Sequence, residues 1–242
     1  GINLGHDRSV AIVRDGEIVV AIEQERLDRI KHSVGLMLQS PDDSRQVQVP
    51  GECIRYCLDA VGVPLDQMST ITPNMPGDDQ GSAIMKGKFS ADIAKQVRDI
   101  PSHHLAHAYS AYWPSGFDDA LVLVVDASGT TFTQADGRWT ESYSLYRASG
   151  TKVELVHGER VLAHLAQLST LGFLYEYITR ATGFITVVGN GLEYAEAGKL
   201  MGLAPYGGPQ PMLNQWISAA PGSLSLEIPA YDIFLEVAAL EK

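Results

Sequence analysis

The stretch that most constrains the fold is a hairpin signal close to the start of the sequence. Residues 9–14, SVAIVR, and residues 17–23, EIVVAIE, are apolar-rich runs separated by Asp15-Gly16. Asp-Gly between two such runs is typical of the tight turn that joins antiparallel strands. A further short run, residues 2–5, precedes the hairpin. We therefore expect an opening sheet in which the second and third strands are antiparallel neighbours.

Helical periodicity follows at three places along the chain. The spacing of apolar residues and the flanking Gly and Pro residues predict helices over residues 50–62, 103–113 and 168–184. The first carries both cysteines, Cys53 and Cys57, four residues apart on an apolar face. No further Cys completes a metal-ligand set, so we expect buried, reduced thiols.

Further strands are predicted between these helices. Residues 120–125, ALVLVV, form an unbroken apolar run, which favours a strand inside a sheet that is covered on both faces. Two strands around the turn ADGR and another over residues 151–161 follow. The polar, Gly-containing residues 73–90 indicate a long mobile loop.

Composition narrows the class of protein. The 242 residues are 45% hydrophobic, enough to bury a core, and 29 acidic against 18 basic residues give a net charge of −11. This charge and the lack of a basic run argue against a nucleic-acid partner. No apolar run approaches membrane-spanning length and no leader pattern opens the sequence, so we expect no membrane partner and a cytoplasmic location.

Three of the seven histidines fall within residues 103–107. On a helix, His103 and His107 stack on one face and can offer two imidazole nitrogens to one cation, whereas His104 points elsewhere. Asp126 follows the apolar strand and can complete two histidines and a carboxylate, a set that suits iron, zinc or manganese. The alternative is a helix-surface histidine pair beside an ordinary strand-end carboxylate.

Other polar groups gather at predicted turns. His6 lies in the turn before the hairpin, where it can hold an anion or a reacting hydroxyl, or simply belong to a polar turn. The hydroxyl and Gly residues Ser128, Gly129 and Thr130 follow a strand, as phosphate-binding segments and plain strand corners both do. Lys31 lies in a charged run that is ordinarily a solvated face.

Four segments taken together resemble the O-carbamoyltransferases of nodulation-factor and antibiotic biosynthesis. They are GHDRSVAIVRDGEIVVAIEQERLDRIKH, PSHHLAHAYSAY, VVDASG and EAGKLMGLAPYG, in that order. The resemblance implies an α/β fold of the actin-like, Hsp70-like ATPase class (ribonuclease H-like), with a mixed sheet flanked by helices and an incomplete second lobe. It implies that residues 1–207 are the N-terminal carbamoyl-transfer domain, mainly its first lobe, and that 208–242 begin the second lobe or form a tail.

The resemblance also implies roles for individual residues. Iron(II), or another divalent metal, would be held by His103, His107 and Asp126. His6 would be the catalytic base and Lys31 would steady developing negative charge. Nucleotide contacts would come from the segments after the central strand and near the end of the matched region, at Ser128, Gly129, Thr130 and Lys199.

The implied reaction is transfer of a carbamoyl group from carbamoyl-adenylate, made from ATP and carbamoyl phosphate, to a hydroxyl of a secondary metabolite or sugar. The family's YrdC-like adenylate-forming domain has no counterpart in these residues, so the C-terminal half of such an enzyme is an expected partner beside the small-molecule acceptor. An actin-like sugar kinase or ATPase module and a non-catalytic binding fragment are the alternatives. A kinase of this fold needs no histidine pair, which favours carbamoyl transfer.

Overall fold

The computed structural model describes residues 1–33, 48–75, 81–166, 170–188, 192–208, 218–219 and 226–227. The chain divides into two compact units. The N-terminal unit comprises Gly1–Pro101 with Val187–Leu192, and the C-terminal unit comprises Ser102–Thr186 with Glu193–Lys242. Strands and helices occur in both units, which confirms the α/β class. The expected division at residue 207 falls near the end of the described range 192–208 and stays a prediction.

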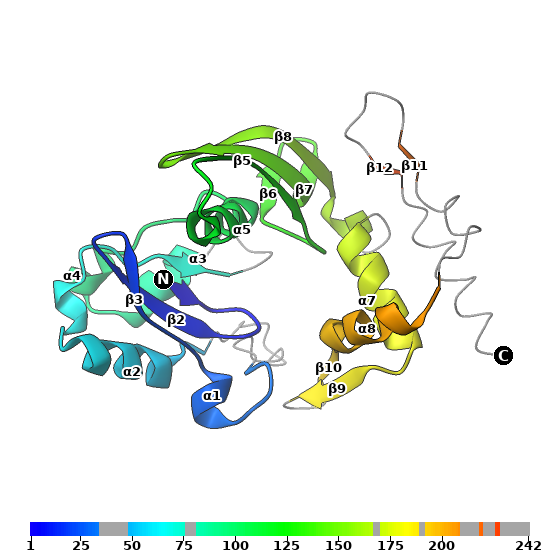
Figure 1. Cartoon of the computed structure of the whole chain (residues 1–242). Helices are drawn as coiled ribbons and strands as arrows, with labels where there is room; N and C mark the ends of the chain where they lie inside the picture. The colour runs from blue at the N-terminus through cyan, green and yellow to red at the C-terminus, as the bar shows by residue number, and fades with distance from the viewer. Residues whose placement is uncertain are drawn as a thin grey trace. The chain divides into compact units, whose positions relative to one another are not determined.

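The N-terminal unit is built on a mixed four-stranded sheet (Figure 1). Its order is β3-β2-β1-β4, with the strands β1 (Ile2–Asn3), β2 (Ser9–Arg14), β3 (Glu17–Glu23) and β4 (Pro73–Asn74). β2 pairs antiparallel with β1 and β3, whereas β4 runs parallel to β1. Asp15 and Gly16 have φ angles of 53° and 86°, the positive values that the tight turn needs. The predicted hairpin is therefore confirmed.

Short helices complete this unit: α1 (Glu25–Asp28), α2 (Gly51–Val61), α3 (Gly81–Lys88), α4 (Ala91–Ala94) and the 3₁₀ turn η1 (Leu65–Gln67). α2 packs on β2 and β3, where its two thiols are buried. It ends as predicted at Gly62, whose φ is 65° and whose N–H closes the last turn. The core joins Ile2, Leu4 and Val10 of the sheet to residues of α2 and α3.

The prediction of a long loop over residues 73–90 is wrong for most of its length. β4 and α3 occupy its two ends, and only residues 76–80 lie outside the described part of the chain. α3 holds two glycines and two lysines, which gave it a loop-like composition. It nevertheless buries the side chain of Met85 completely in the core. Tertiary packing therefore stabilises a helix that the helix propensities of its residues do not predict.

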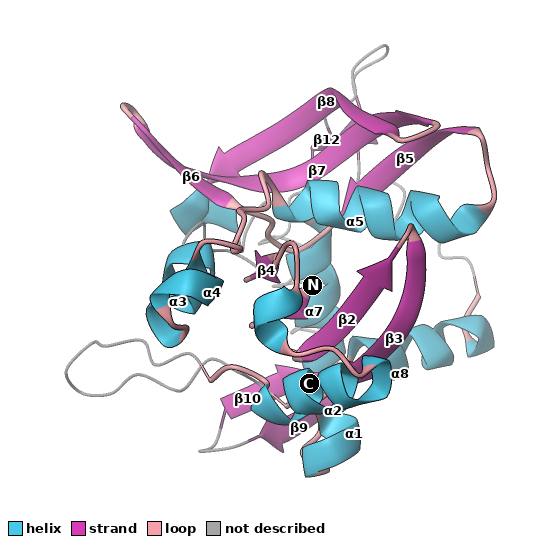
Figure 2. Cartoon of the chain, turned by 90° about the vertical axis from the view of Figure 1, so that its left-hand side faces the viewer, coloured by secondary structure: helices cyan, strands magenta, loops and turns pink. Residues whose placement is uncertain are grey.

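The C-terminal unit holds an antiparallel sheet of four strands: β5 (Asp119–Val125), β6 (Thr131–Gln134), β7 (Gly137–Ser149) and β8 (Lys152–Leu162). The long strand β7 is central, with β8 along one edge and β5 and β6 along the other. The helix α5 (His103–Tyr112) packs along one face of this sheet, as Figure 2 shows. The elements that follow along the chain are η2 (Trp113–Ser115), η3 (Ala163–Leu165), α7 (Leu171–Ala181), β9 (Ile185–Val188), β10 (Leu192–Ala195), α8 (Ala197–Leu203), η4 (Ala204–Tyr206), β11 (Ser218–Ala219) and β12 (Leu226–Glu227). The end of β9 and the first residue of β10 fall in the range Val187–Leu192, which belongs to the N-terminal unit.

β5 is a strand as predicted, but the prediction that both its faces are covered is wrong. Val122 and Val124 are buried against α5, where Ala108 and Tyr112 meet them. On the other face the side chain of Leu123 is 63% exposed, and its neighbours in the pleat are exposed as well. β5 also pairs on one side only among the described strands. An unbroken apolar run therefore did not distinguish an interior strand from an edge strand with one covered face.

None of the helices that the structure describes combines the length and the apolar character that are needed to cross a bilayer.

Candidate metal centre

The position of the two ligand histidines is set by where α5 begins. Ser102 has extended backbone angles, and its Oγ accepts the N–H of Leu105 at 3.0 Å, so it caps the helix. Capping at Ser102 starts the helix at His103 and places His107 one turn later on the same side. His104, between them, points into the unit and is fully buried, which confirms that it faces away from the pair.

Asp126 directly follows β5 and meets the histidine pair. The Nε2 atoms of His103 and His107 are 2.9 Å apart, and Oδ2 of Asp126 lies 3.1 Å from the first and 3.6 Å from the second. Donors at right angles around a cation, each about 2.1 Å from it, lie about 3 Å from one another. Two of the three separations match this spacing and the third, 3.6 Å, is longer, so the donors lie close enough to share one cation, and their chemistry suits a divalent transition metal.

This cluster is open on one side. The side chain of His103 is 9% exposed, whereas those of His107 and Asp126 are 49% and 30% exposed. Burial alone would raise the pKa of Asp126, but hydrogen bonds with His103 and His107 and from the N–H of Ala127 lower that pKa well below its usual value. The carboxylate is thus ionised at neutral pH and ready to bind a cation, with positions left for further ligands.

A buried carboxylate lies behind the cluster. Glu141, on β7, accepts hydrogen bonds from Ser102 Oγ at 2.7 Å and from the N–H of Thr130 at 2.9 Å. The backbone N–H of His104 points to the same carboxylate at 3.5 Å, and the Nδ1 atom of His104 pairs with Ser144 Oγ at 2.8 Å. The first turn of α5 is therefore bonded to β7 through side chains that the sequence analysis did not single out.

The residues predicted to contact a nucleotide after β5 are engaged within the unit. Ser128 Oγ bonds with Thr140 Oγ1 at 2.9 Å, and Thr130 Oγ1 accepts the N–H of His103 at 2.8 Å. A Cβ on Gly129 would lie 2.7 Å from both the Glu141 carboxylate and the His104 ring. These contacts hold residues 128–130 against the start of α5, the helix that carries His103 and His107. Contact of this segment with a nucleotide stays a prediction.

α7 also packs on the segment that carries Asp126. Thr170 caps α7 and donates from Oγ1 to the carbonyl of Ala127 at 2.8 Å. A Cβ on Gly172 would come within 2.6 Å of the backbone of Asp126 and Ala127, so only glycine fits. Sequence reasoning missed this contact, although a glycine inside a strongly periodic helix was the available signal.

A second polar cluster lies in the N-terminal unit, around His6 in the turn between β1 and β2. Asp7 bridges two imidazoles: its Oδ2 lies 2.6 Å from Nδ1 of His6, and its Oδ1 lies 2.9 Å from Nδ1 of His32. Burial would raise the pKa of Asp7, but the two imidazoles lower it on balance. Asp7 and His32 have positive φ angles of 53° and 62°, which non-glycine residues adopt mainly where the surroundings enforce them.

Buried Arg8 joins the segments that carry these groups. Its Nε donates to the carbonyl of Ser33 at 2.6 Å and its Nη2 donates to Ser33 Oγ at 2.7 Å. Lys31 lies in the same segment and is exposed. The last predicted residue, Lys199, is exposed on α8 of the C-terminal unit.

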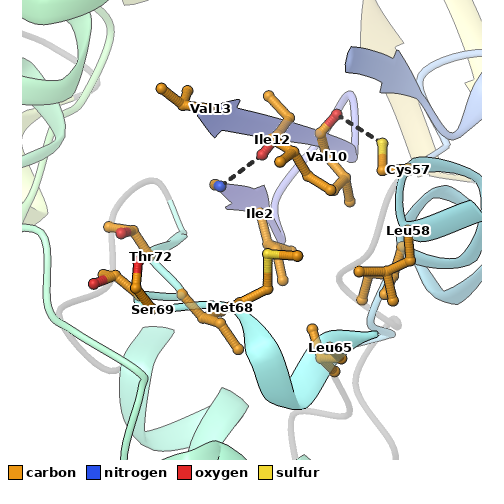
Figure 3. Close-up of a pocket in the computed structure, with 15 residues that line it drawn as sticks. Ile2, Val10, Ile12, Val13, Cys57, Leu58, Leu65, Met68, Ser69 and Thr72 are labelled. Atoms are coloured by element: carbon orange, nitrogen blue, oxygen red, sulfur yellow. Dashed lines mark hydrogen bonds between the residues drawn. The ribbon is translucent and has the colours of Figure 1, made fainter. Parts of the chain in front are cut away.

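One pocket of about 290 Å³ lies in the N-terminal unit and is shown in Figure 3. Apolar side chains from the sheet, α2 and η1 line most of it, among them Ile2, Val10, Ile12, Leu58 and Leu65. None of the nine site residues predicted from the sequence lines this pocket. The predicted site residues therefore lie outside this cavity.

Curated proteins that are similar in sequence to most of this chain are considerably longer than it. The nodulation protein NolNO of Sinorhizobium fredii is 31% identical over 231 residues, which cover 85% of this chain and 28% of NolNO. The uncharacterized protein sll1178 of Synechocystis is 29% identical over 242 residues, covering 85% of this chain and 34% of sll1178. This chain therefore spans about a third of the length of the curated relatives it matches.

Among solved structures, YeaZ from Pseudomonas aeruginosa covers 66% of this chain and 65% of its own, at 16% identity and a TM-score of 0.35. The assignment to the actin-like class continues to rest on the sequence resemblance. The model of the family described as carbamoyltransferase N-terminus matches residues 81–220, a range that includes His103, His107 and Asp126. The chain belongs to the carbamoyltransferase family, as part of its N-terminal region.

Proposed function

We propose that this chain is the carbamoyl-transfer part of an O-carbamoyltransferase. The donor is carbamoyl-adenylate, made from carbamoyl phosphate and ATP, and the acceptor is a hydroxyl of a secondary metabolite or sugar. The observation that carries the proposal is the convergence of His103, His107 and Asp126, with donor atoms 2.9–3.6 Å apart, in a chain of this family.

The metal ligands fit the group that the family implies. Two imidazoles and an ionised carboxylate would hold a divalent cation, iron(II) by the resemblance, with its remaining positions facing the open side of the cluster. When bound, the cation supplies Lewis-acid stabilisation of negative charge on phosphate oxygens. The support for this role is the donor set and its exposure.

His6 is the proposed base. When Nδ1–H of His6 donates to Asp7, Nε2 keeps its lone pair and can accept the proton of the acceptor hydroxyl. The hydroxyl oxygen then bonds to the carbamoyl carbon, the bond from that carbon to the phosphate oxygen breaks, and AMP leaves with the electron pair. Lys31 would steady the developing negative charge.

Metal analysis of the anaerobically purified chain tests the site first. We expect near-stoichiometric iron in the wild type and its loss in a His103→Ala, His107→Ala double variant. The matched control is His164→Ala, because His164 is an exposed histidine of the same unit outside the cluster. Equal metal content in the double variant and the control would rule out this histidine cluster as the metal site.

A transfer assay then tests the reaction. The chain is supplied with carbamoyl-adenylate and a panel of hydroxyl acceptors, and both AMP release and the carbamate ester are measured. We expect the His6→Asn variant to lose transfer while keeping its metal. Release of ADP from ATP without carbamoyl phosphate would instead favour the sugar kinase.

A further inference from the structure

One buried carboxylate contacts both segments that carry the metal ligands. Glu141 is 6% exposed and lies on the central strand β7, beneath the first turn of α5. Among the described residues, the hydroxyl of Ser102 and the backbone N–H groups of Thr130 and His104 donate to its carboxylate. Ser102 and His104 flank the ligand His103, while Thr130 belongs to the segment that follows the ligand Asp126. A single side chain thus bonds to both ligand-bearing segments.

The backbone reinforces this connection. Gly129 N–H donates to the carbonyl of Glu141 at 2.9 Å, and the N–H of Glu141 donates to the carbonyl of Thr130 at 3.2 Å. Thr130 Oγ1 in turn accepts the N–H of His103 at 2.8 Å. The three segments therefore form one bonded network, and its side-chain centre is a carboxylate. Movement of α5 relative to the segment after β5 would break bonds to Glu141 as well as the bond between His103 and Thr130.

Both the charge and the length of this side chain matter. In the described part of the chain the hydrogen-bond partners of the Glu141 carboxylate all act as donors to it, so both oxygens of an ionised acid can accept, whereas the amide nitrogen of a glutamine could accept from none of them. Its place at the start of α5 also suits a negative charge, because the free N–H groups of a helix carry partial positive charge there. An aspartate would keep the charge but lack the reach to Ser102 and Thr130 together.

We propose that Glu141 is a positioning residue of the metal centre: it fixes the first turn of α5 against the segment after β5, and so sets the distances between His103, His107 and Asp126. The inference rests on the proposed metal site. Groups that orient ligands from behind commonly change metal affinity by about 10-fold to 100-fold when they are altered. We expect an effect of that size here, with the fold retained.

Anaerobic titration of the 242-residue chain with Co²⁺, followed by its visible absorption, tests the proposal. Glu141→Gln removes the charge, and Glu141→Asp keeps the charge but withdraws the carboxylate. The control is Glu154→Gln, which removes an exposed carboxylate from β8 of the same unit. We expect the dissociation constant to rise about 10-fold to 100-fold in both Glu141 variants, with an altered cobalt spectrum, and to stay at the wild-type value in the control.

The outcomes separate positioning from its alternatives. Wild-type affinity in Glu141→Asp, with a loss only in Glu141→Gln, would mean that Glu141 acts through its charge alone and would overturn the proposal. Lower thermal stability with unchanged affinity in the folded variants would overturn it too, since that is the effect of a merely structural residue. A wild-type chain that binds no cobalt would remove the proposed metal centre itself, and the role of Glu141 with it.

A second variant covers the case in which the Glu141 variants do not fold. Ser102→Ala removes one donor to Glu141 and the cap of α5, and it leaves the carboxylate in place. We expect a several-fold rise in the cobalt dissociation constant. Unchanged cobalt affinity in folded Ser102→Ala would overturn the proposal.

Discussion

At the scale of single residues, the packing around Gly129 makes a sharp prediction. A side chain there would approach the Glu141 carboxylate and the His104 ring to 2.7 Å, and both of these groups are buried. We expect Gly129→Ala to lower the free energy of unfolding by about 1–3 kcal/mol, because a buried cluster must shift to admit one methyl group. Urea denaturation measures this loss.

The matched control for this prediction is Gly198→Ala in α8. Gly198 belongs to the same unit, and a Cβ there would meet nothing within 4 Å. Alanine is also the better helix former, so this change should be neutral or stabilising by up to about 1 kcal/mol. Equal destabilisation by the two substitutions would show that contact with Glu141 and His104 is not what requires glycine at position 129.

Residues near one another in sequence were the predictable part of the site. His103 and His107 follow from helical spacing, and Asp126 follows from its place after an apolar strand, so the sequence predicted that these three would meet. Glu141 could not be found this way. It lies 39 residues from Ser102 along the chain, and only the pairing of β7 with its neighbours brings the two side chains together.

At the scale of elements, the buried face of α2 predicts how stability depends on pH. Burial raises the pKa of the Cys53 thiol to about 11, and the neighbouring Cys57 contributes to this rise as the second cause. In the unfolded chain the thiol loses its proton near pH 8.5. Between these values the folded chain binds more protons than the unfolded chain, so the free energy of unfolding falls as the pH rises from about 8.5 toward 11.

Urea denaturation at pH 7, 8.5 and 10 measures this dependence, and a Cys53→Ala variant isolates it from other titrating groups. We expect the wild type to lose more stability than the variant over this range. Iodoacetamide should also label the native thiols slowly at pH 8 and quickly in urea, because only the thiolate reacts. Parallel pH profiles for the two proteins would contradict the raised pKa.

Elements were predictable where local signals and packing agree. The hairpin and α2 have turn and cap residues whose backbone angles match their sequence, such as Gly16 and Gly62. α3 was missed because its residues favour a loop while Met85 anchors it in the core. The second face of β5 was misjudged, because an apolar run does not say which of its side chains another layer covers.

At the scale of the whole molecule, each unit has its own core. One cluster is centred on Leu4, Cys53 and Met85 in the N-terminal unit, and the other joins α5 to β5 and β7 in the C-terminal unit. The sequence showed no linker between them, because the break between Pro101 and Ser102 falls directly before the cap of α5. The three metal ligands all belong to the C-terminal unit, whereas the cluster around His6 belongs to the other.

Because the metal ligands and the core around Leu4 belong to different units, we expect a bound metal to stabilise the C-terminal unit only. A core mutation in the N-terminal unit should leave this stabilisation by the metal unchanged. Leu4 is fully buried, so Leu4→Ala should destabilise the N-terminal unit by about 2–5 kcal/mol. A cation at 100 times its dissociation constant should stabilise the C-terminal unit by about 2.7 kcal/mol. Differential scanning calorimetry of the chain with and without Co²⁺ should therefore show two transitions, of which the cation raises one and Leu4→Ala lowers the other. A single transition that both changes shift would show instead that the two cores unfold together, and that ligand binding in one unit reports on the stability of both.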